Sequence, residues 1–462
     1  MANTQRLVLL IAILASFVAF LDGSVVNVAL PKITSQLGGG LAVQQWIVDG
    51  YTLTLGAFIL LAGSLSDTFG QKRILTYGLI GFGITSLLCA YSPNSNILIF
   101  SRLLQGGAAA LLVPSSLALI ISTFKGEEQA KAIGRWTAWT GVAFVIGPLF
   151  GGFLIDALSW RWIFAINLIP ILLTLQLLHG LPYPEEKRGR ARLDLLGGIL
   201  CVTGLGLPVY ALIEQPKYGA SSPVFLLPLV LGLAILFFFL RTEKRKSNAI
   251  LPLSIFRVRN FKIGNLATAS IYAGLAIATF LLAIYLQQIA GYSALDAGLA
   301  LLPVTIVMFG LSPIFGSLSG KYGPRFFMTA GPLTAAAGFL LMLSFSSHAA
   351  YFSHLLPGIL LFALGLSCTV SPLTSAVLSD VEPGHAGIAS AVNNAISRIA
   401  GLVAIACIGL ITGKSLTTNG FHRTLIATAL LMAVGGIISA LGIRNRKDKS
   451  RHDSSLKVKA PA

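Results

Sequence analysis

The chain has 462 residues, of which 55 % are hydrophobic and only 11 % are charged, and its mean hydropathy is +0.82. Soluble domains carry roughly 25 % charged residues, so this composition excludes an ordinary soluble enzyme or binding domain. The formal net charge of +17 would suggest a nucleic-acid partner in a soluble protein, and its meaning here depends on where the basic residues lie.

Fourteen apolar segments follow one another from the N-terminus to the C-terminus. A helix needs about 20 apolar residues to cross the ~30 Å hydrocarbon core of a bilayer, and each segment is close to that length. The expected spans are 7–30, 44–65, 74–92, 97–121, 133–155, 162–180, 193–213, 223–241, 262–288, 297–318, 326–346, 354–377, 387–412 and 423–443. The sequence therefore predicts an all-α polytopic membrane protein with 14 transmembrane helices.

Basic residues lie mostly in alternate connections between these segments. With a cytoplasmic N-terminus, 26 of the 33 Lys and Arg residues lie on the cytoplasmic side and five lie outside. Cytoplasmic loops carry an excess of Lys and Arg, so we expect both termini in the cytoplasm. Compact loops favour a bacterial inner (plasma) membrane. The basic charge then reports topology and gives no reason to expect nucleic acid as a partner.

Asp22 interrupts the first apolar segment, where its carboxyl group would lie well inside the membrane. An ionisable group in a span is costly, and it usually forms an ion pair, faces water or takes part in transport. Arg102 lies at a similar depth in the fourth segment. If the two segments adjoin, we expect Asp22 and Arg102 to meet, either as a proton-coupling pair or as a static ion pair that fixes helix packing.

A short motif occurs twice, after the second and the tenth apolar segments. Residues 63–73 read GSLSDTFGQKR, and residues 316–325 read GSLSGKYGPR. Transporters built from repeated halves place the substrate near the midplane between them. The repeat predicts two related six-helix halves, with a two-helix insert between them and a tail after the second. The expected boundaries are 1–180 and 260–443 for the halves, 181–259 for the insert and 444–462 for the basic, disordered tail.

The fifth apolar segment combines small residues with one proline. The residues concerned are Gly141, Gly147, Pro148, Gly151 and Gly152. Small residues let helices approach closely, and proline removes a backbone donor and favours a kink. The segment is therefore expected to offer a close-packing face or a pivot.

Polar residues in other segments are candidates for lining a central cavity. They are Asn27, Asp49, Tyr51, Gln105, Tyr272, Asn393, Asn394 and Arg398. The alternative for each is a hydrogen bond to a neighbouring helix. Arg398 would lie near mid-membrane with no acidic residue nearby in its own half, so its charge is costly unless it faces water, Asp22 or an anionic substrate.

The sequence contains no motif for catalysis or for cofactor binding. It has no GxxxxGK[ST] phosphate loop, and its four cysteines are scattered singly without a Cys/His cluster. We therefore expect no enzymatic activity, no metal and no cofactor, and no direct use of ATP.

Five segments of the first half resemble one family when they are taken together. They read LDGSVVNVALP (21–31), GSLSDTFGQKR (63–73), RLLQGGAAALLVPSS (102–116), GVAFVIGPLFGG (141–152) and WRWIFAINLIP (160–170). In this order and spacing they resemble the major facilitator superfamily, specifically its fourteen-span drug:proton antiporter group, which includes EmrB and QacA. Two later segments, QQIAGYSALDAGLALLP (287–303) and AVNNAISRIAG (391–401), extend the resemblance over essentially the whole chain.

The resemblance implies roles for several residues. Spans 1 and 4 adjoin in this family, which would bring Asp22 and Arg102 together for proton coupling. The family's loop after span 2 stabilises the outward-facing state, and a solvated basic loop is the alternative. The residues that match this conformational switch are Gly63, Asp67, Gly70 and Arg73. The glycine-rich pattern of span 5 is characteristic of the family's antiporters, and helix packing alone is the alternative.

The resemblance therefore implies a proton-coupled antiporter that exports hydrophobic or amphipathic small molecules by alternating access. Multidrug efflux and antibiotic resistance are the expected activities, and the protein would act in the bilayer as a monomer. Two alternatives stay open. One is a dedicated exporter of a single endogenous metabolite, lipid or antibiotic, and the other is a passive facilitator or channel.

Overall fold

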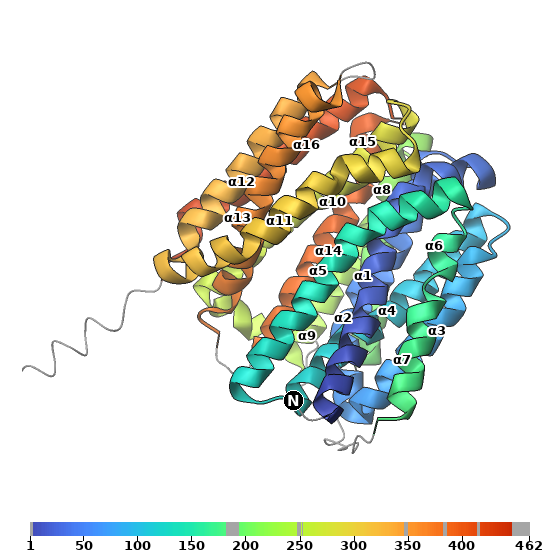
Figure 1. The fold of residues 1–462 in the computed structure, drawn as a ribbon. Helices are drawn as coiled ribbons and strands as arrows, with labels where there is room; N and C mark the ends of the chain where they lie inside the picture. Colours follow the sequence, from blue (N-terminus) through green and yellow to red (C-terminus); the bar gives the residue numbers. More distant parts are fainter. Residues whose placement is uncertain are drawn as a thin grey trace, which may run out of the picture.

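The computed structural model describes residues 3–181, 194–246, 251, 253–345, 350–381, 386–413 and 416–445 (Figure 1). These residues form helices and no strand. The first helices are α1 (Asn3–Leu37), α2 (Leu41–Phe69), α3 (Gln71–Ala90), α4 (Ser95–Thr123), α5 (Gly126–Ala157), α6 (Trp162–Ala165) and α7 (Leu168–His179). The others are α8 (Leu195–Tyr218), α9 (Pro223–Arg245), η1 (Leu253–Arg257), α10 (Arg259–Gln288), α11 (Ala294–Tyr322), α12 (Pro324–Leu341), η2 (Met342–Ser344), η3 (Tyr351–Leu355), α13 (Leu356–Leu378), α14 (Ala386–Ala406), α15 (Ile408–Thr412) and α16 (Thr418–Gly442).

Thirteen helical segments of the described part are long and apolar enough to cross a membrane. The helix α2 is a further long one, with 29 residues. Backbone polar groups must be satisfied internally within lipid, and a helix achieves this with its own hydrogen bonds. The expected all-α polytopic architecture is therefore confirmed.

Two segments that the sequence predicts as continuous spans are interrupted. The segment at 162–180 is divided into α6 and α7 around Asn167. Pro170 lacks the N–H group that would bond to the carbonyl of Ile166, so the helix is weak at this point. The segment at 387–412 is divided into α14 and α15 at Cys407. Each segment is nevertheless a single candidate span, at Trp162–His179 and Gly387–Thr412, as the sequence predicted.

The packing of α1 to α7 recurs in α10 to α16. In the first set, α1 packs on α4, α5 and α7, and α4 also packs on α2 and α3. In the second set, α10 packs on α13, α14 and α16, and α13 also packs on α11 and α12. The face of the molecule where α1 begins is called the N-terminal face below, and the opposite one is the distal face (Figure 1).

The two sets of helices touch most extensively along two seams, α5 with α11 and α2 with α14, and α1 also contacts α10. Polar contacts across both seams lie toward the distal face. The Asp156 carboxylate at the end of α5 accepts a hydrogen bond of 2.8 Å from the N–H of Leu295 in the first turn of α11. Gln45 near the start of α2 donates a 2.5 Å hydrogen bond to the carbonyl of Ile405. Since unpaired N–H groups at a helix start attract a carboxylate, Asp156 joins the two sets favourably.

The hairpin of α8 and α9 lies outside both sets. The helix α8 packs on α9 and contacts α2 and α14, so it lies beside the seam between these two helices. Leu205, Val209 and Ile213 of α8 share a buried cluster with Leu53 and Leu402 from the two sides of the seam. At the N-terminal face, Lys246 after α9 forms a 2.6 Å ion pair with Asp194, which caps α8.

Candidate functional site

Asp22 and Arg102 form an ion pair in the interior of the first set of helices. Asp22 lies in α1 and is 0 % exposed, while Arg102 lies in α4 and is 1 % exposed. Arg102 Nη1 lies 2.5 Å from Asp22 Oδ2. The sequence-based expectation that these residues meet therefore describes the geometry correctly, although the pair's role in proton coupling stays a prediction.

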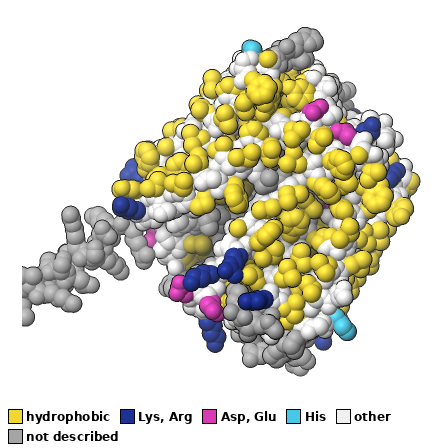
Figure 2. Space-filling view, viewed as in Figure 1, with side chains coloured by type: hydrophobic (Ala, Val, Ile, Leu, Met, Phe, Trp, Pro, Cys, Tyr) yellow, Lys and Arg dark blue, Asp and Glu magenta, His cyan; other side chains and the backbone are white. Residues whose placement is uncertain are grey.

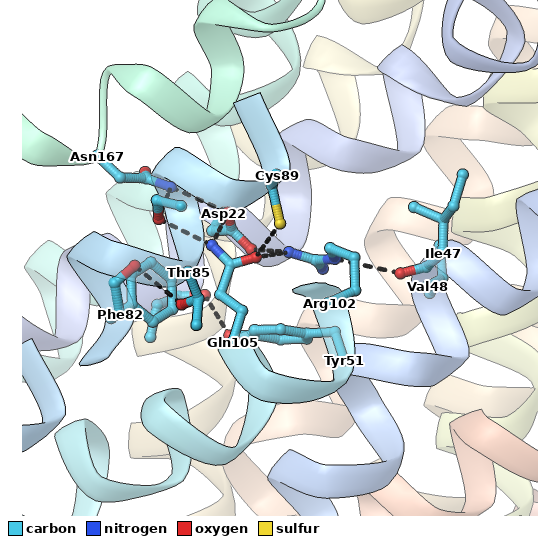
Figure 3. A network of polar contacts seen from close by, with 12 residues as sticks. Asp22, Ile47, Val48, Tyr51, Phe82, Thr85, Cys89, Arg102, Gln105 and Asn167 are labelled. Atoms are coloured by element: carbon cyan, nitrogen blue, oxygen red, sulfur yellow. Dashed lines mark hydrogen bonds and ion pairs between the residues drawn. The ribbon is translucent and has the colours of Figure 1, made fainter. Parts of the chain in front are cut away.

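Three further polar side chains complete the surroundings of the carboxylate (Figure 3). Gln105 Nε2 donates to Asp22 Oδ1 at 3.1 Å, and Asn167 Nδ2 donates to the same oxygen at 3.0 Å. Gln105 Nε2 also donates to Ser86 Oγ at 2.9 Å. All of these residues are 0 % exposed. The carboxylate is thus held by donors from α4 and from the break between α6 and α7.

The guanidinium of Arg102 is held in place from α2 as well. Arg102 Nε donates to the carbonyl of Ile47 at 3.2 Å, and the guanidinium carbon lies 4.2 Å from the centre of the Tyr51 ring. Close contact between α2 and α4 depends on Gly106, because a Cβ there would lie 2.1 Å from the Tyr51 carbonyl oxygen. Small residues allow such approach between membrane helices. A cation over an aromatic face is further stabilised when it is desolvated.

The glycine-rich motif of α5 serves two different contacts. A Cβ at Gly147 would lie 1.9 Å from Ser24 Oγ, and one at Gly151 would lie 2.0 Å from Val25 Cγ2, so both face α1. A Cβ at Gly152 would lie 2.7 Å from the carbonyl oxygen of Ala294, so this glycine faces α11 across the seam.

The remaining motif residues lie beside these contacts. The Pro148 carbonyl oxygen also meets α11, since it would lie 2.5 Å from a Cβ at Gly298. Gly141 is exposed and has no heavy atom within 4 Å of an added Cβ. The motif thus allows close contact of α5 with α1 and α11 near the distal face, whereas Gly141 at its other end is exposed.

The two copies of the GSLS motif end their helices in the same way. Gly70 follows α2 with a φ of 97°, and Gly323 follows α11 with a φ of 88°. Each donates its N–H to the carbonyl of the motif's second serine, Ser66 or Ser319. A positive φ favours glycine, which explains the equal spacing in both copies.

The other residues of the expected conformational switch are placed as follows. Gly63 lies within α2 with no heavy atom within 4 Å of an added Cβ, and Arg73 is exposed in the first turn of α3. The side chain of Asp67 lies outside the described residues, as does most of the basic tail at 444–462.

The predicted cavity residues separate into three groups. Tyr51 and Gln105 are buried in the Asp22 network. Asn393 donates to Asn265 Oδ1 at 3.0 Å and to Thr268 Oγ1 at 2.8 Å, between α14 and α10.

The third group contains buried polar atoms that form no hydrogen bond with the described residues. These atoms are Asn27 Oδ1, both carboxylate oxygens of Asp49 and Arg398 Nε. Tyr272 and Asn394 are partly exposed. Asp49 itself is 0 % exposed, one turn after Gln45 on the side of α2 that faces α14.

Sequence reasoning missed Ser86 and Asn167. Asn167 is a polar residue inside an apolar span, in a segment that already carries the family resemblance, and this could have singled it out. Ser86 gives no such signal, because a serine in a span usually bonds to its own helix. Only the packing of α3 against α4 and α7 reveals its place.

The family model described as Major Facilitator Superfamily matches residues 12–405. The chain belongs to the major facilitator superfamily. It is therefore a multi-pass membrane transporter and not an enzyme, as the sequence predicted.

Several relatives in this superfamily are named for drug or antibiotic resistance. The chain is 35 % identical to the puromycin resistance protein of Streptomyces alboniger over 94 % of its own length and 87 % of that protein. It is 34 % identical to the multidrug resistance protein Stp of Mycobacterium tuberculosis over 91 % of its length and 78 % of that protein. Identity to the methylenomycin A resistance protein of Bacillus subtilis is 32 %, over 90 % of the chain and 89 % of that protein.

Solved major facilitator structures share the fold. A peptide transporter POT in complex with sulfate matches with a TM-score of 0.71 at 16 % identity, covering 95 % of this chain and 93 % of that one. A D-xylose-proton symporter matches with a TM-score of 0.69 at 15 % identity, covering 95 % and 98 %. At this level of identity the likeness concerns the fold alone.

Proposed function

We propose that this transporter is a proton-coupled antiporter that exports hydrophobic or amphipathic small molecules by alternating access. The observation that carries the proposal is the fully buried Asp22–Arg102 pair with its converging amide donors. An ionisable group inside a membrane bundle marks a proton or substrate pathway by default. The names of the relatives, which refer to resistance to puromycin, methylenomycin A and multiple drugs, support export as the direction.

We further propose that the chain crosses the membrane 14 times, with six-helix halves at 1–180 and 260–443 and an insert at 181–259. The recurrence of the same helix pairings in α1 to α7 and α10 to α16 supports this division. The position of the α8–α9 hairpin outside both sets supports its role as an insert.

Both termini are proposed to lie in the cytoplasm of a bacterial cell, with the N-terminal face inward. Most Lys and Arg side chains on the face in Figure 2 lie toward the N-terminal edge of the apolar surface, in agreement with an excess of basic residues in cytoplasmic loops. The distal polar contacts would then close the outer side in this conformation.

The proton site lies next to the contacts that alternating access must change. Two residues after Asp22, Ser24 Oγ donates to the Ala143 carbonyl of α5 at 3.3 Å. Further along α5, Pro148 and Gly152 meet α11 across the seam. A change in the Asp22–Arg102 pair can therefore shift α1 against α5, and α5 against α11.

The following cycle uses these contacts. Substrate enters from the N-terminal face while Asp22 is ionised and paired with Arg102. The halves then rock so that the distal contacts open, and substrate leaves. Protonation of Asp22 from that side weakens its pairing with Arg102 and favours the return, after which the proton is released inward.

The test of the proposal is Asp22→Asn, measured in proteoliposomes under an imposed pH gradient with a panel of unrelated dyes. The amide cannot ionise, so we expect pH-driven efflux to fall to the level of empty liposomes while the protein still inserts normally. Glu127→Gln is the matched control, because Glu127 is 83 % exposed and pairs with Lys131 one turn away on the surface. Uphill transport that persists in Asp22→Asn would place the proton site elsewhere, and its absence in the unmodified protein would indicate a passive facilitator.

A further inference from the structure

Arg398 is a charged residue that the proton site does not use. It lies in α14, and its guanidinium carbon is 5.8 Å from the centre of the Phe20 ring in α1. Its charge also acts on the hydroxyl groups of Tyr51 in α2 and Tyr272 in α10. Arg398 therefore lies where helices of both sets meet, beside the Phe20 ring and within electrostatic range of two tyrosine hydroxyl groups.

Within the described part of the chain, this guanidinium has no anionic partner. None of the ion pairs there involves Arg398, and its Nε is buried without a hydrogen bond. The two acidic residues deep within the described helices are committed elsewhere or remote. Asp22 is paired with Arg102, and Asp49 is fully buried on α2, near Cys407 rather than in a pair with Arg398.

The surroundings of Arg398 leave access to its side chain. Three side chains at this place are only partly buried, namely those of Phe20, Tyr272 and Arg398. The helices α1 and α10 are packed against other helices along much of their remaining length. Gly56 of α2 brings α14 close, since a Cβ there would lie 3.4 Å from the Cβ of Arg398. A partly accessible cation beside aromatic rings is suited to a ligand that has an apolar body and an acidic group.

We propose that Arg398 binds the acidic group of the transported compound, whose apolar body lies against Phe20 and Tyr272, so that preferred substrates are amphipathic organic anions. This inference rests on the proposed export function and specifies its substrate class. A lone cation in a membrane bundle is costly, and an anionic ligand removes that cost by pairing with it.

The experiment uses three pyrene probes that share one apolar body: 1-pyrenebutyrate, 1-pyrenebutanol and pyrenebutyl-trimethylammonium. Binding to the full-length protein in nanodiscs is followed by quenching of tryptophan fluorescence, with empty nanodiscs as the correction for lipid partitioning and without a pH gradient. We expect pyrenebutyrate to bind about 10- to 100-fold more tightly than pyrenebutanol, as for a charge-assisted hydrogen bond.

Two variants at one position separate charge from shape. Arg398→Gln should bind pyrenebutyrate and pyrenebutanol equally, whereas Arg398→Lys should retain most of the preference. Arg423→Gln removes the same charge at an exposed position of α16 and should change nothing. Equal or tighter binding of the cationic probe to the unmodified protein, or an anion preference that survives in Arg398→Gln, would overturn the inference.

The binding experiment and the efflux experiment can contradict their two proposals separately. An anion preference that depends on Arg398, found in a protein that shows no pH-driven efflux, supports the anion site and contradicts only the proposed proton coupling. Efflux that is driven by pH but equally fast for anionic and cationic probes contradicts only the anion site.

Discussion

At the scale of single residues, the Asp22–Arg102 pair is a stability element as well as a functional candidate. Two buried charges satisfy each other, and the hydrogen bonds from Gln105 and Asn167 satisfy the remaining carboxylate oxygen. A buried pair adds little stability over a well-packed apolar one, but removal of one partner leaves an uncompensated charge. Substitution of one partner should therefore lower the free energy of unfolding much more than substitution of both partners.

We expect Arg102→Gln to lower the free energy of unfolding by about 3–5 kcal/mol. The double variant Asp22→Asn with Arg102→Gln should recover much of this loss, because neither buried charge remains. Unfolding in detergent, followed by denaturant titration, measures both effects, and Arg423→Gln is the control for loss of a positive charge. A double variant no more stable than Arg102→Gln would mean that packing, and not charge, holds this site.

At the scale of elements, the α8–α9 hairpin is fastened at its N-terminal end by Asp194. Burial opposes ionisation of Asp194, but hydrogen bonds from Lys246 and from the Gly197 N–H outweigh it and hold its pKa below the usual value. A group whose pKa is lowered by folding stabilises the fold above its unfolded pKa of about 3.9. This stabilisation is lost as the pH falls through the lower, folded value.

We therefore expect Lys246→Gln to accelerate hydrogen exchange in the first turn of α8 by roughly 5-fold at neutral pH, as for loss of a partly exposed ion pair. The difference from the unmodified protein should disappear as the pH falls through the folded pKa of Asp194, below which the carboxyl group is protonated in both proteins. Lys217→Gln, at the other end of α8, is the control. A difference that persisted at acid pH would show that the effect is not due to the Asp194 charge.

At the scale of the whole molecule, the two sets of helices can rock only if their distal contacts open and close. Gly152 of α5 lies directly against the backbone of Ala294 and Leu295 in α11. Backbone cannot move aside as a flexible side chain can, so an added methyl group there must push the two sets apart.

Gly152→Ala should destabilise the distally closed state by about 1–3 kcal/mol, which is a shift of roughly 5- to 150-fold toward the distally open one. Spin labels at Leu158 and Leu299, both exposed and on the two sides of the seam, measure the shift as a longer distance distribution in a cysteine-free background. Gly141→Ala is the matched control, because an added Cβ there meets nothing within 4 Å. Equal distributions in both variants would exclude this seam as part of the moving interface.

Much of the fold followed from the sequence because membrane insertion depends on local properties. A run of about 20 apolar residues must become a helix in lipid, wherever its neighbours lie. The repeated GSLS motif likewise predicted equivalent helix ends, and Gly70 and Gly323 both have the positive φ that such an end requires. The break at Asn167 was missed because the apolar composition continues through it.

The site was only partly predictable. An intramembrane acid and base are conspicuous in sequence, so Asp22 and Arg102 could be paired on depth and resemblance. Their partners come from distant positions, with Asn167 145 residues after Asp22, and hydrogen bonds of this kind leave no mark on local composition. For the same reason the sequence could not tell that Tyr51 and Gln105 belong to the Asp22 network, while Arg398 has no acidic partner among the described residues.

The sequence by itself determined that this is a helical membrane transporter of the major facilitator superfamily, because hydrophobic length and motif spacing are written along the chain. The tertiary structure alone decided which buried charges are neutralised and which are free. That distinction depends on distances of a few ångströms between helices far apart in sequence. In a low-dielectric interior, the electrostatic energy of a charge depends on whether an opposite charge lies within such a distance.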